Sequence, residues 1–169
     1  MKKPIAVLQY LLSIHILALL ILAIIRTILY IANINQTEGV GSKTILFTKA
    51  MLKGLWSDNT MSCYIIALPL LVLLIFALYN KIPKVLIKVF NIYFIILYSI
   101  LFGFSIADIP YFIYNFTHIG ASIFNWLGYG TDTAGMILQE KSYYIYFFIY
   151  AITITAFSFA AIHLAGKLL

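Results

Sequence analysis

The stretch IAVLQYLLSIHILALLILAII, from Ile5 to Ile25, decides the class of fold. It contains no Asp, Glu, Lys or Arg, and it is as long as the roughly 20 apolar residues that a helix needs to cross the hydrocarbon core of a bilayer. Lys2 and Lys3 precede it, but the run is too long for a signal peptide and no small-residue cleavage site follows. The sequence therefore predicts a first transmembrane helix that is retained and that continues less regularly to Ile34.

The composition of the whole chain also indicates a membrane protein. Of the 169 residues, 64% are hydrophobic and 9% are charged, and the mean hydropathy is +1.04. A water-soluble domain of this size would need more charged residues to cover its surface. The net charge of +6 suggests a nucleic-acid-binding protein, but the lysines lie at the ends of apolar runs, where they flank membrane spans. We therefore expect membrane lipids, and no nucleic acid, as partners.

Three further apolar runs are long enough to span a bilayer. With the first, they predict an all-α integral membrane protein that forms a single transmembrane domain over residues 1–169. The expected spans are at about 5–30, 61–79, 85–107 and 143–164. Pro69 lies inside the second span and should kink it, which is tolerable where a neighbouring helix satisfies the freed carbonyl.

The positions of the lysines predict the orientation of these spans. Lys81, Lys84 and Lys88 crowd the short connection between the second and third spans, and the positive-inside rule places such a cluster in the cytoplasm. Both termini are then cytoplasmic. The abundance of Ile, Tyr, Phe, Asn and Lys suits an AT-rich bacterial genome, so we expect a bacterial cytoplasmic membrane. All five acidic residues then fall on the outer side: Glu38, Asp58, Asp108, Asp132 and Glu140.

Two long connections on the outer side are too apolar for solvated loops. In residues 43–56, Lys49 and Lys53 stand one helical turn apart in an otherwise apolar segment, which is typical of a helix that lies in the membrane interface. Residues 109–140 are rich in aromatic side chains that suit headgroup depth. There, Asp108 is expected to cap a helix whose first turn contains Pro110. The sequence thus predicts four spans with interfacial helices in the outer loops.

Arg26 is the sharpest candidate for a functional residue. It lies roughly 30 Å along the first helix from Ile5, close to the outer boundary of the hydrocarbon. Two interpretations stay open: the guanidinium extends to lipid headgroups, or it pairs with an outer acid, either Asp58 or Asp108. Those two acids are themselves either plain helix N-caps or parts of a polar site that faces headgroups.

The histidines and the rest of the polar inventory indicate no catalytic chemistry. His118 lies among aromatic residues and is interpreted as an interfacial residue more readily than as a ligand. His15 and His163 lie on the inner side, away from the acids, and no role is assigned to them. The sequence has no His, Cys and carboxylate cluster with metal-ligand spacing, no phosphate-binding loop and no serine elbow. We therefore predict no catalytic residue, no metal site and no cofactor in this chain.

Four stretches carry a resemblance to a known family: KGLWSDNTMSCYIIALP at 53–69, ADIPYF at 107–112, ASIFNW at 121–126 and GMILQEKSY at 135–143. In their order and approximate spacing, they resemble the amino-terminal membrane part of the lipoteichoic acid synthase family of phosphoglycerol transferases. The resemblance is strongest to the sulfatase-like members of the Bacteroidetes, and it is spread over about half of the chain.

The resemblance implies a plug of five transmembrane helices that carries an extracytoplasmic alkaline-phosphatase-like domain. That domain would use a threonine nucleophile and a divalent metal, typically manganese, to transfer phosphoglycerol or a similar headgroup. This chain departs from the pattern because it stops after four spans. We therefore expect the soluble catalytic domain to be absent, and the chain to be a truncated form, the product of a split gene or a fragment.

No catalytic residue of the family carries over to this chain. Asp58, Asp108, Tyr111, Asn125 and Trp126 lie in the family-like stretches, and we expect them to shape the surface where a lipid substrate or the outer domain docks. With the residues singled out above, the candidate lipid-facing or domain-facing set is Arg26, Asp58, Asp108, Tyr111, His118, Asn125 and Trp126.

The functional hypothesis is a membrane anchor and lipid-headgroup-facing module of a phosphoglycerol-transferase-like or phosphoethanolamine-transferase-like enzyme, inactive without its catalytic domain. Two alternatives stay open. One is a membrane scaffold or assembly protein that binds the membrane domain of a partner. The other is a small transporter, whose path would be lined by polar residues of the spans: Gln9, Ser13, His15, Asn91, Ser99 and Thr153.

Overall fold

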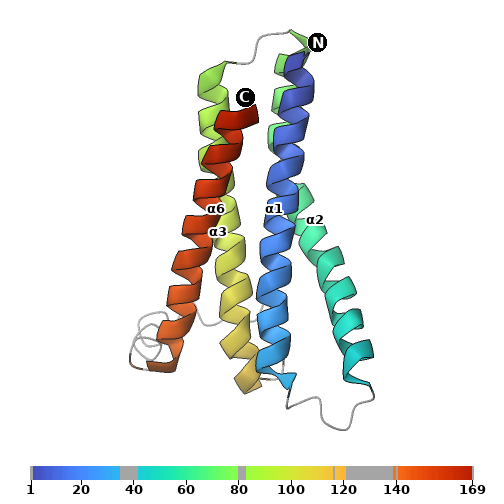
Figure 1. Ribbon diagram of the computed structural model, residues 1–169, viewed down its shortest axis with the longest axis vertical. Helices are drawn as coiled ribbons and strands as arrows, with labels where there is room; N and C mark the ends of the chain where they lie inside the picture. Colours follow the sequence, from blue (N-terminus) through green and yellow to red (C-terminus); the bar gives the residue numbers. More distant parts are fainter. Residues whose placement is uncertain are drawn as a thin grey trace.

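The computed structural model describes residues 2–34, 42–79, 83–115, 117–120, 139 and 141–168, and within them the protein is all-α. Four long helices in these ranges form a bundle (Figure 1), and a 3₁₀ turn, η3 (Lys141–Tyr143), leads into the last of them. The helices are α1 (Lys2–Ala32), α2 (Lys43–Leu78), α3 (Lys84–Asn115) and α6 (Tyr144–Leu168).

All four of these helices in the described ranges are long and apolar enough to cross a membrane. The qualifying segments are Ile5–Ala32, Lys43–Phe76, Val85–Asn115 and Lys141–Lys167. This confirms the predicted all-α fold with four membrane spans. Each helix is longer than the bilayer core requires, so the helices accommodate the excess by tilting or by extending into the headgroup layer.

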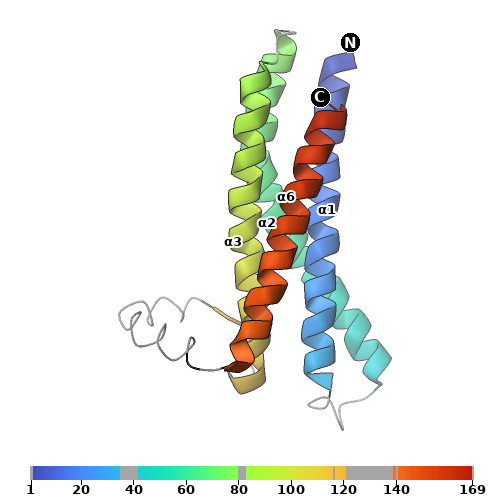
Figure 2. The same ribbon diagram turned by 60° about the vertical axis from the view of Figure 1, so that its left-hand side comes forward.

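The helices alternate in direction, and both termini lie at the same end of the bundle (Figures 1 and 2). α1 is the central helix because it packs against each of the other three. α3 and α6 form a close pair on one side. α2 packs mainly on α1, and its first half diverges from α1 towards the end opposite the termini (Figure 1).

The core lies between α1, α3 and α6. One face of α1 is buried at intervals of three and four residues, and α3 buries nearly every fourth residue, as expected for helices packed along a single seam. The buried apolar side chains are Val7, Tyr10, Leu11, Ile14, Ala18, Leu22 and Ile25 on α1, Pro69 and Leu73 on α2, Phe90, Phe94, Tyr98, Phe102, Ile106 and Ile109 on α3, and Phe157 and Ala161 on α6. The opposite faces expose their large apolar side chains, which suits contact with lipid.

Aromatic rings join α3 to α6. The ring centroid of Phe157 lies 5.1 Å from that of Tyr98 and 5.3 Å from that of Phe102, the latter pair edge to face. Gly103 lets Tyr150 approach, since a Cβ at position 103 would lie 3.3 Å from Cε2 of Tyr150. The Tyr150 hydroxyl donates to the Ser99 carbonyl at 3.2 Å. Close packing and this hydrogen bond therefore hold the described parts of α3 and α6 together.

Pro69 is tolerated inside α2 because another helix satisfies the backbone group that it leaves unpaired. Proline has no N–H, so the carbonyl of Ile65, four residues earlier, loses its helical donor. The hydroxyl of Tyr93 on α3 donates to this carbonyl at 3.1 Å. The expectation that a neighbouring helix satisfies the freed carbonyl is confirmed.

Two local predictions at the helix boundaries are wrong. Residues 43–56 and the second span form one helix, α2, without a break, and Asp58 lies inside it and not at an N-cap. The Asp58 carboxylate pairs with Arg26 on α1 and does not cap a helix. Whether the first half of α2 lies in the membrane interface stays a prediction.

Asp108 and Pro110 likewise lie inside α3, which continues to Asn115, so Asp108 caps no new helix. Its carboxylate accepts hydrogen bonds from the chain that follows the helix. Most of the predicted interfacial segment 109–140 lies outside the described residues, as do Asn125 and Trp126.

We expect Tyr93→Phe to lower the free energy of unfolding by about 1 kcal/mol, because it removes the donor to the Ile65 carbonyl in an apolar setting. In a Pro69→Ala background, the restored N–H of residue 69 can bond Ile65, so the same change should cost much less. Thermal unfolding of the four proteins of this double-mutant cycle in one detergent measures the difference. Equal costs in both backgrounds would contradict the assigned role of Tyr93.

Candidate functional site

Arg26 and Asp58 form an ion pair between α1 and α2. Nη2 of Arg26 donates to Oδ1 of Asp58 at 2.8 Å, and Asp58 is only 9% exposed. Gly54, one turn before Asp58, makes room for the guanidinium, since a Cβ at position 54 would overlap the Nε and Cζ atoms of Arg26. The sequence left the partner of Arg26 open between two acids and the headgroups, and the structure selects Asp58.

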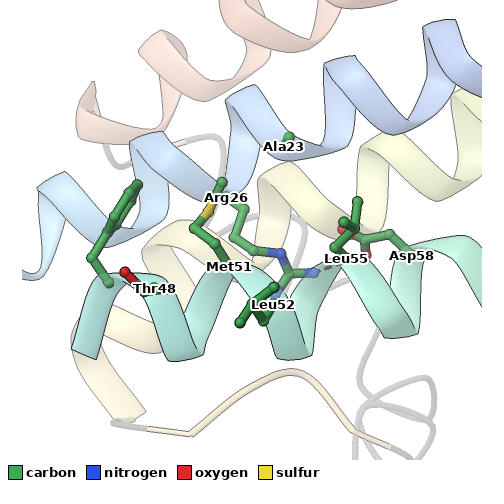
Figure 3. A pocket seen from close by; sticks show the side chains of 8 residues that line it. Ala23, Arg26, Thr48, Met51, Leu52, Leu55 and Asp58 are labelled. Carbon is green, nitrogen blue, oxygen red and sulfur yellow. Dashed lines mark hydrogen bonds and ion pairs between the residues drawn. The ribbon is translucent and has the colours of Figure 1, made fainter. Parts of the chain in front are cut away.

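The ion pair lies at a cleft of about 310 Å³ between α1 and the first half of α2 (Figure 3). Apart from the ion pair and one threonine, its walls are apolar. The lining residues are Ala23, Arg26, Phe47, Thr48, Met51, Leu52, Leu55 and Asp58. The Nε atom of Arg26 is buried and has no hydrogen-bond partner in the described part of the chain. The cleft therefore combines an apolar wall with a guanidinium whose donors are not all used.

A second acid–base pair lies at the end of α3, between Asp108 in the helix and His118 beyond it. Oδ2 of Asp108 lies 2.6 Å from Nδ1 of His118, and Oδ1 accepts the backbone N–H of Ile119 at 2.7 Å. The ring of Phe112 packs against the imidazole, with centroids 4.8 Å apart. Because Nδ1 of His118 donates to the carboxylate, Nε2 of this largely exposed ring is available to a group outside the protein.

The two pairs occupy the same end of the bundle. At 1.5 Å per residue, Arg26 and Asp108 each lie about 36 Å from the first residue of their helix. α1 and α3 both begin at the end where the termini lie and run away from it (Figure 1). Within the described residues, no hydrogen bond or ion pair joins the Arg26 pair to the Asp108 pair.

The remaining candidate residues from the sequence are Tyr111, Asn125 and Trp126. Tyr111 lies half-buried in the last turns of α3, and its carbonyl accepts the Asn115 side-chain amide at 3.1 Å. Asn125 and Trp126 lie outside the described residues. No group of three His, Cys, Asp or Glu side chains in the ranges that the structure describes could hold a metal ion, so we assign no metal chemistry to them.

Sequence reasoning missed a chain of hydrogen bonds around His15. Nδ1 of His15 lies 2.7 Å from the Ser62 hydroxyl, and Nε2 lies 3.0 Å from Oδ1 of Asn59. The Ser62 hydroxyl in turn lies 2.6 Å from the hydroxyl of Tyr98. Ser62 and Tyr98 are fully buried. These hydrogen bonds therefore connect α1, α2 and α3 at one level, and the row of bonded groups runs across the bundle and not along it.

We expect Arg26→Ala to lower the free energy of unfolding by about 2 kcal/mol, because it leaves the Asp58 carboxylate without its partner in a largely buried position. Lys49→Ala removes an equally charged but exposed side chain and should change stability by less than about 0.5 kcal/mol. Thermal unfolding in detergent compares the two. Equal melting temperatures for both variants would contradict a structural role of the ion pair.

Among the hydrogen bonds around His15, removing the Ser62 hydroxyl should lower the free energy of unfolding more than removing the Tyr98 hydroxyl. Ser62→Ala leaves the buried Tyr98 hydroxyl and the part-buried Nδ1 of His15 without their partner, so we expect a cost of about 2 kcal/mol. Tyr98→Phe removes only a donor, and about 1 kcal/mol is expected. Ser105→Ala is the matched control, since within the described residues the Ser105 hydroxyl bonds its own helix, at the Leu101 carbonyl, 3.0 Å away. A larger cost for Tyr98→Phe than for Ser62→Ala would contradict these hydrogen bonds.

Comparisons with known proteins leave the family open: no protein-family model, no curated protein sequence and no solved structure matches this chain. The fold and the site geometry therefore establish a multi-span helical membrane protein with two acid–base pairs at one end, and the resemblance stated from the sequence stays a hypothesis about its family.

Proposed function

We propose that this chain is the membrane anchor and lipid-headgroup-facing module of a phosphoglycerol-transferase-like enzyme, whose chemistry is carried by an extracytoplasmic catalytic domain. One observation carries the proposal. Both acid–base pairs of the described residues, Arg26 with Asp58 and Asp108 with His118, lie towards the end of the bundle opposite the termini. With both termini in the cytoplasm, this is the end where outer-leaflet headgroups and an outer domain would meet the module.

The family-like stretches support the proposal because they contribute inward-facing residues as well as lipid-facing ones. From the stretch 53–69, Gly54, Asp58, Ser62 and Pro69 are all buried, and each contacts or faces the rest of the bundle. From the stretch 107–112, Asp108 holds His118 and the segment after α3. Two residues of these stretches, Asp58 and Asp108, each supply the carboxylate of an acid–base pair, whereas their partners Arg26 and His118 lie outside the stretches.

The charge of the first half of α2 fits an anionic lipid partner. Lys43, Lys49 and Lys53 are exposed there, and Asp58, the acid of this half-helix, is already paired with Arg26. Basic residues beside an apolar surface attract anionic phospholipids at the membrane interface. Phosphatidylglycerol, the donor that a phosphoglycerol transferase would use, belongs to this class of lipid.

The metal chemistry of such an enzyme would belong to the catalytic domain. The described residues of this chain hold no three metal-ligating side chains together, and each carboxylate of the two acid–base pairs already has a partner within the bundle. The module would contribute anchoring, orientation and lipid contact, whereas a divalent metal, typically manganese, and a nucleophilic hydroxyl would act in the outer domain.

Deleting the gene should reduce the phosphoglycerol groups of the cell envelope, and reintroducing it should restore them. Phosphorus NMR of extracted envelope glycans and lipids measures the change. Reintroducing the Arg26→Ala variant should restore less of the phosphoglycerol content than the parental gene does, and the Lys49→Ala variant is the matched control. A phosphoglycerol content that stays at the parental level after deletion would contradict the transferase role and favour a scaffold protein.

The same strains test the orientation on which the proposal depends. In a Cys63→Ser background, Thr117→Cys places a thiol just beyond α3, and Gly166→Cys places one near the C-terminus, where a Cβ meets nothing within 4 Å. A membrane-impermeant maleimide added to intact cells should label position 117 and spare position 166. Labelling of position 166 alone would place the two acid–base pairs in the cytoplasm and overturn the proposal.

A further inference from the structure

We propose that His15 is a proton-sensitive latch for α2. In its neutral form, with the proton on Nε2, the ring holds α2 against α1 and α3, and protonation of Nδ1 releases this hold. The latch depends only on helix contacts and does not depend on the transferase role proposed above.

The direction of the hydrogen bonds follows from the buried end of the chain. The Tyr98 hydroxyl is fully buried, and its one bond in the described part of the protein goes to Ser62. A buried hydroxyl needs an acceptor for its proton, so Tyr98 donates to Ser62. Ser62 then donates its own proton to Nδ1 of His15, and Nε2–H of His15 donates to the side-chain oxygen of Asn59. Every proton in this chain has an acceptor.

Protonation breaks this arrangement at its buried end. Adding a proton to Nδ1 turns it from an acceptor into a donor, so the Ser62 hydroxyl must now accept from His15. If Ser62 also keeps accepting from Tyr98, its own proton loses its acceptor, and if it donates to Tyr98, the Tyr98 proton loses its acceptor. Either way, one buried hydroxyl proton is left without an acceptor among the described residues. His15 also lies about 15 Å along α1 from Ile5, near the middle of the hydrocarbon, where a charged ring is unfavourable.

Within the described residues, the hydrogen-bond partners of His15 are uncharged and would not offset that charge. On α2, Asp58 lies next to Asn59 but is bonded to Arg26, and Cys63 is exposed. On α3, the Tyr93 hydroxyl is bonded to the Ile65 carbonyl. On α6, Phe157 covers Tyr98, and the Tyr150 hydroxyl is bonded to the Ser99 carbonyl. The hydrogen bonds of the described residues therefore connect His15 to neutral partners.

α2 is the helix that such a change would move. It packs mainly on α1, and within the described residues it adds two buried apolar side chains, Pro69 and Leu73, to the core. Its other polar links are the Arg26–Asp58 ion pair, the Tyr93–Ile65 bond and a bond from the Tyr30 hydroxyl to the Lys43 carbonyl at 2.8 Å. Releasing the His15 bonds would loosen α2 next to the cleft at Arg26.

The test uses the chain in lipid nanodiscs with His118→Gln and His163→Gln, so that His15 is the one histidine that remains. Spin labels at Ile24 on α1 and Leu52 on α2, both exposed, report the spacing of the two helices in a Cys63→Ser background. On lowering the pH from about 8 to about 5, we expect the distance distribution to broaden and the melting temperature to fall by about 5 °C.

His15→Gln is the matched variant, because its side-chain oxygen can accept from Ser62 at any pH. It should show neither the broadening nor the fall in melting temperature. Should this variant fail to fold, ¹⁵N NMR of labelled histidine in the His15 protein at pH 8 gives an independent answer, with a neutral ring protonated on Nε2 expected. A ring protonated on Nδ1, or the same acid response in His15→Gln, would overturn the latch.

Discussion

The absence of water inside a bilayer is the constraint on which the rest of this structure depends. Between helices in lipid, apolar contact provides no hydrophobic driving force, and a polar group without a protein partner is costly. The bundle satisfies its polar groups across helix boundaries: Tyr93 bonds the Ile65 carbonyl that Pro69 frees, and Arg26 neutralises Asp58. These contacts also determine which helix faces which, since apolar side chains alone would pack in many registers.

Two different kinds of contact hold the two sides of α1. On one side, α3 and α6 present aromatic rings and small residues, and the rings of Tyr98, Phe102 and Phe157 interdigitate. On the other side, α2 contributes little to the buried core and depends on directed bonds. Packing is insensitive to protons, whereas directed bonds to a histidine and to an ion pair are sensitive to them. The α2 side is therefore where the fold can respond to its surroundings.

The spans could be predicted from the sequence because length and hydropathy suffice to identify a helix in lipid. The helix boundaries could not be predicted in the same way. Asp58 and Asp108 follow the rules for N-caps in water, where a carboxylate at a helix interior gains little. Inside this bundle their carboxylates have tertiary partners, Arg26 and His118, so α2 and α3 continue through them. A tertiary contact overrode a local capping signal in both cases.

The candidate site shows the same limit. Depth along α1 pointed to Arg26, but depth could not choose between Asp58 and Asp108, because both lie just beyond the ends of their expected spans, 61–79 and 85–107. His15 was passed over for the opposite reason: its depth put it far from every acid, and its partners turned out to be the neutral residues Ser62 and Asn59. A histidine in the middle of a membrane span needs partners for both ring nitrogens, whether or not those partners are charged. The polar residues of the facing helices were therefore the signal that could have identified the partners of His15. Which of them lie beside His15 depends on the register of α1 against α2, which the sequence alone does not give.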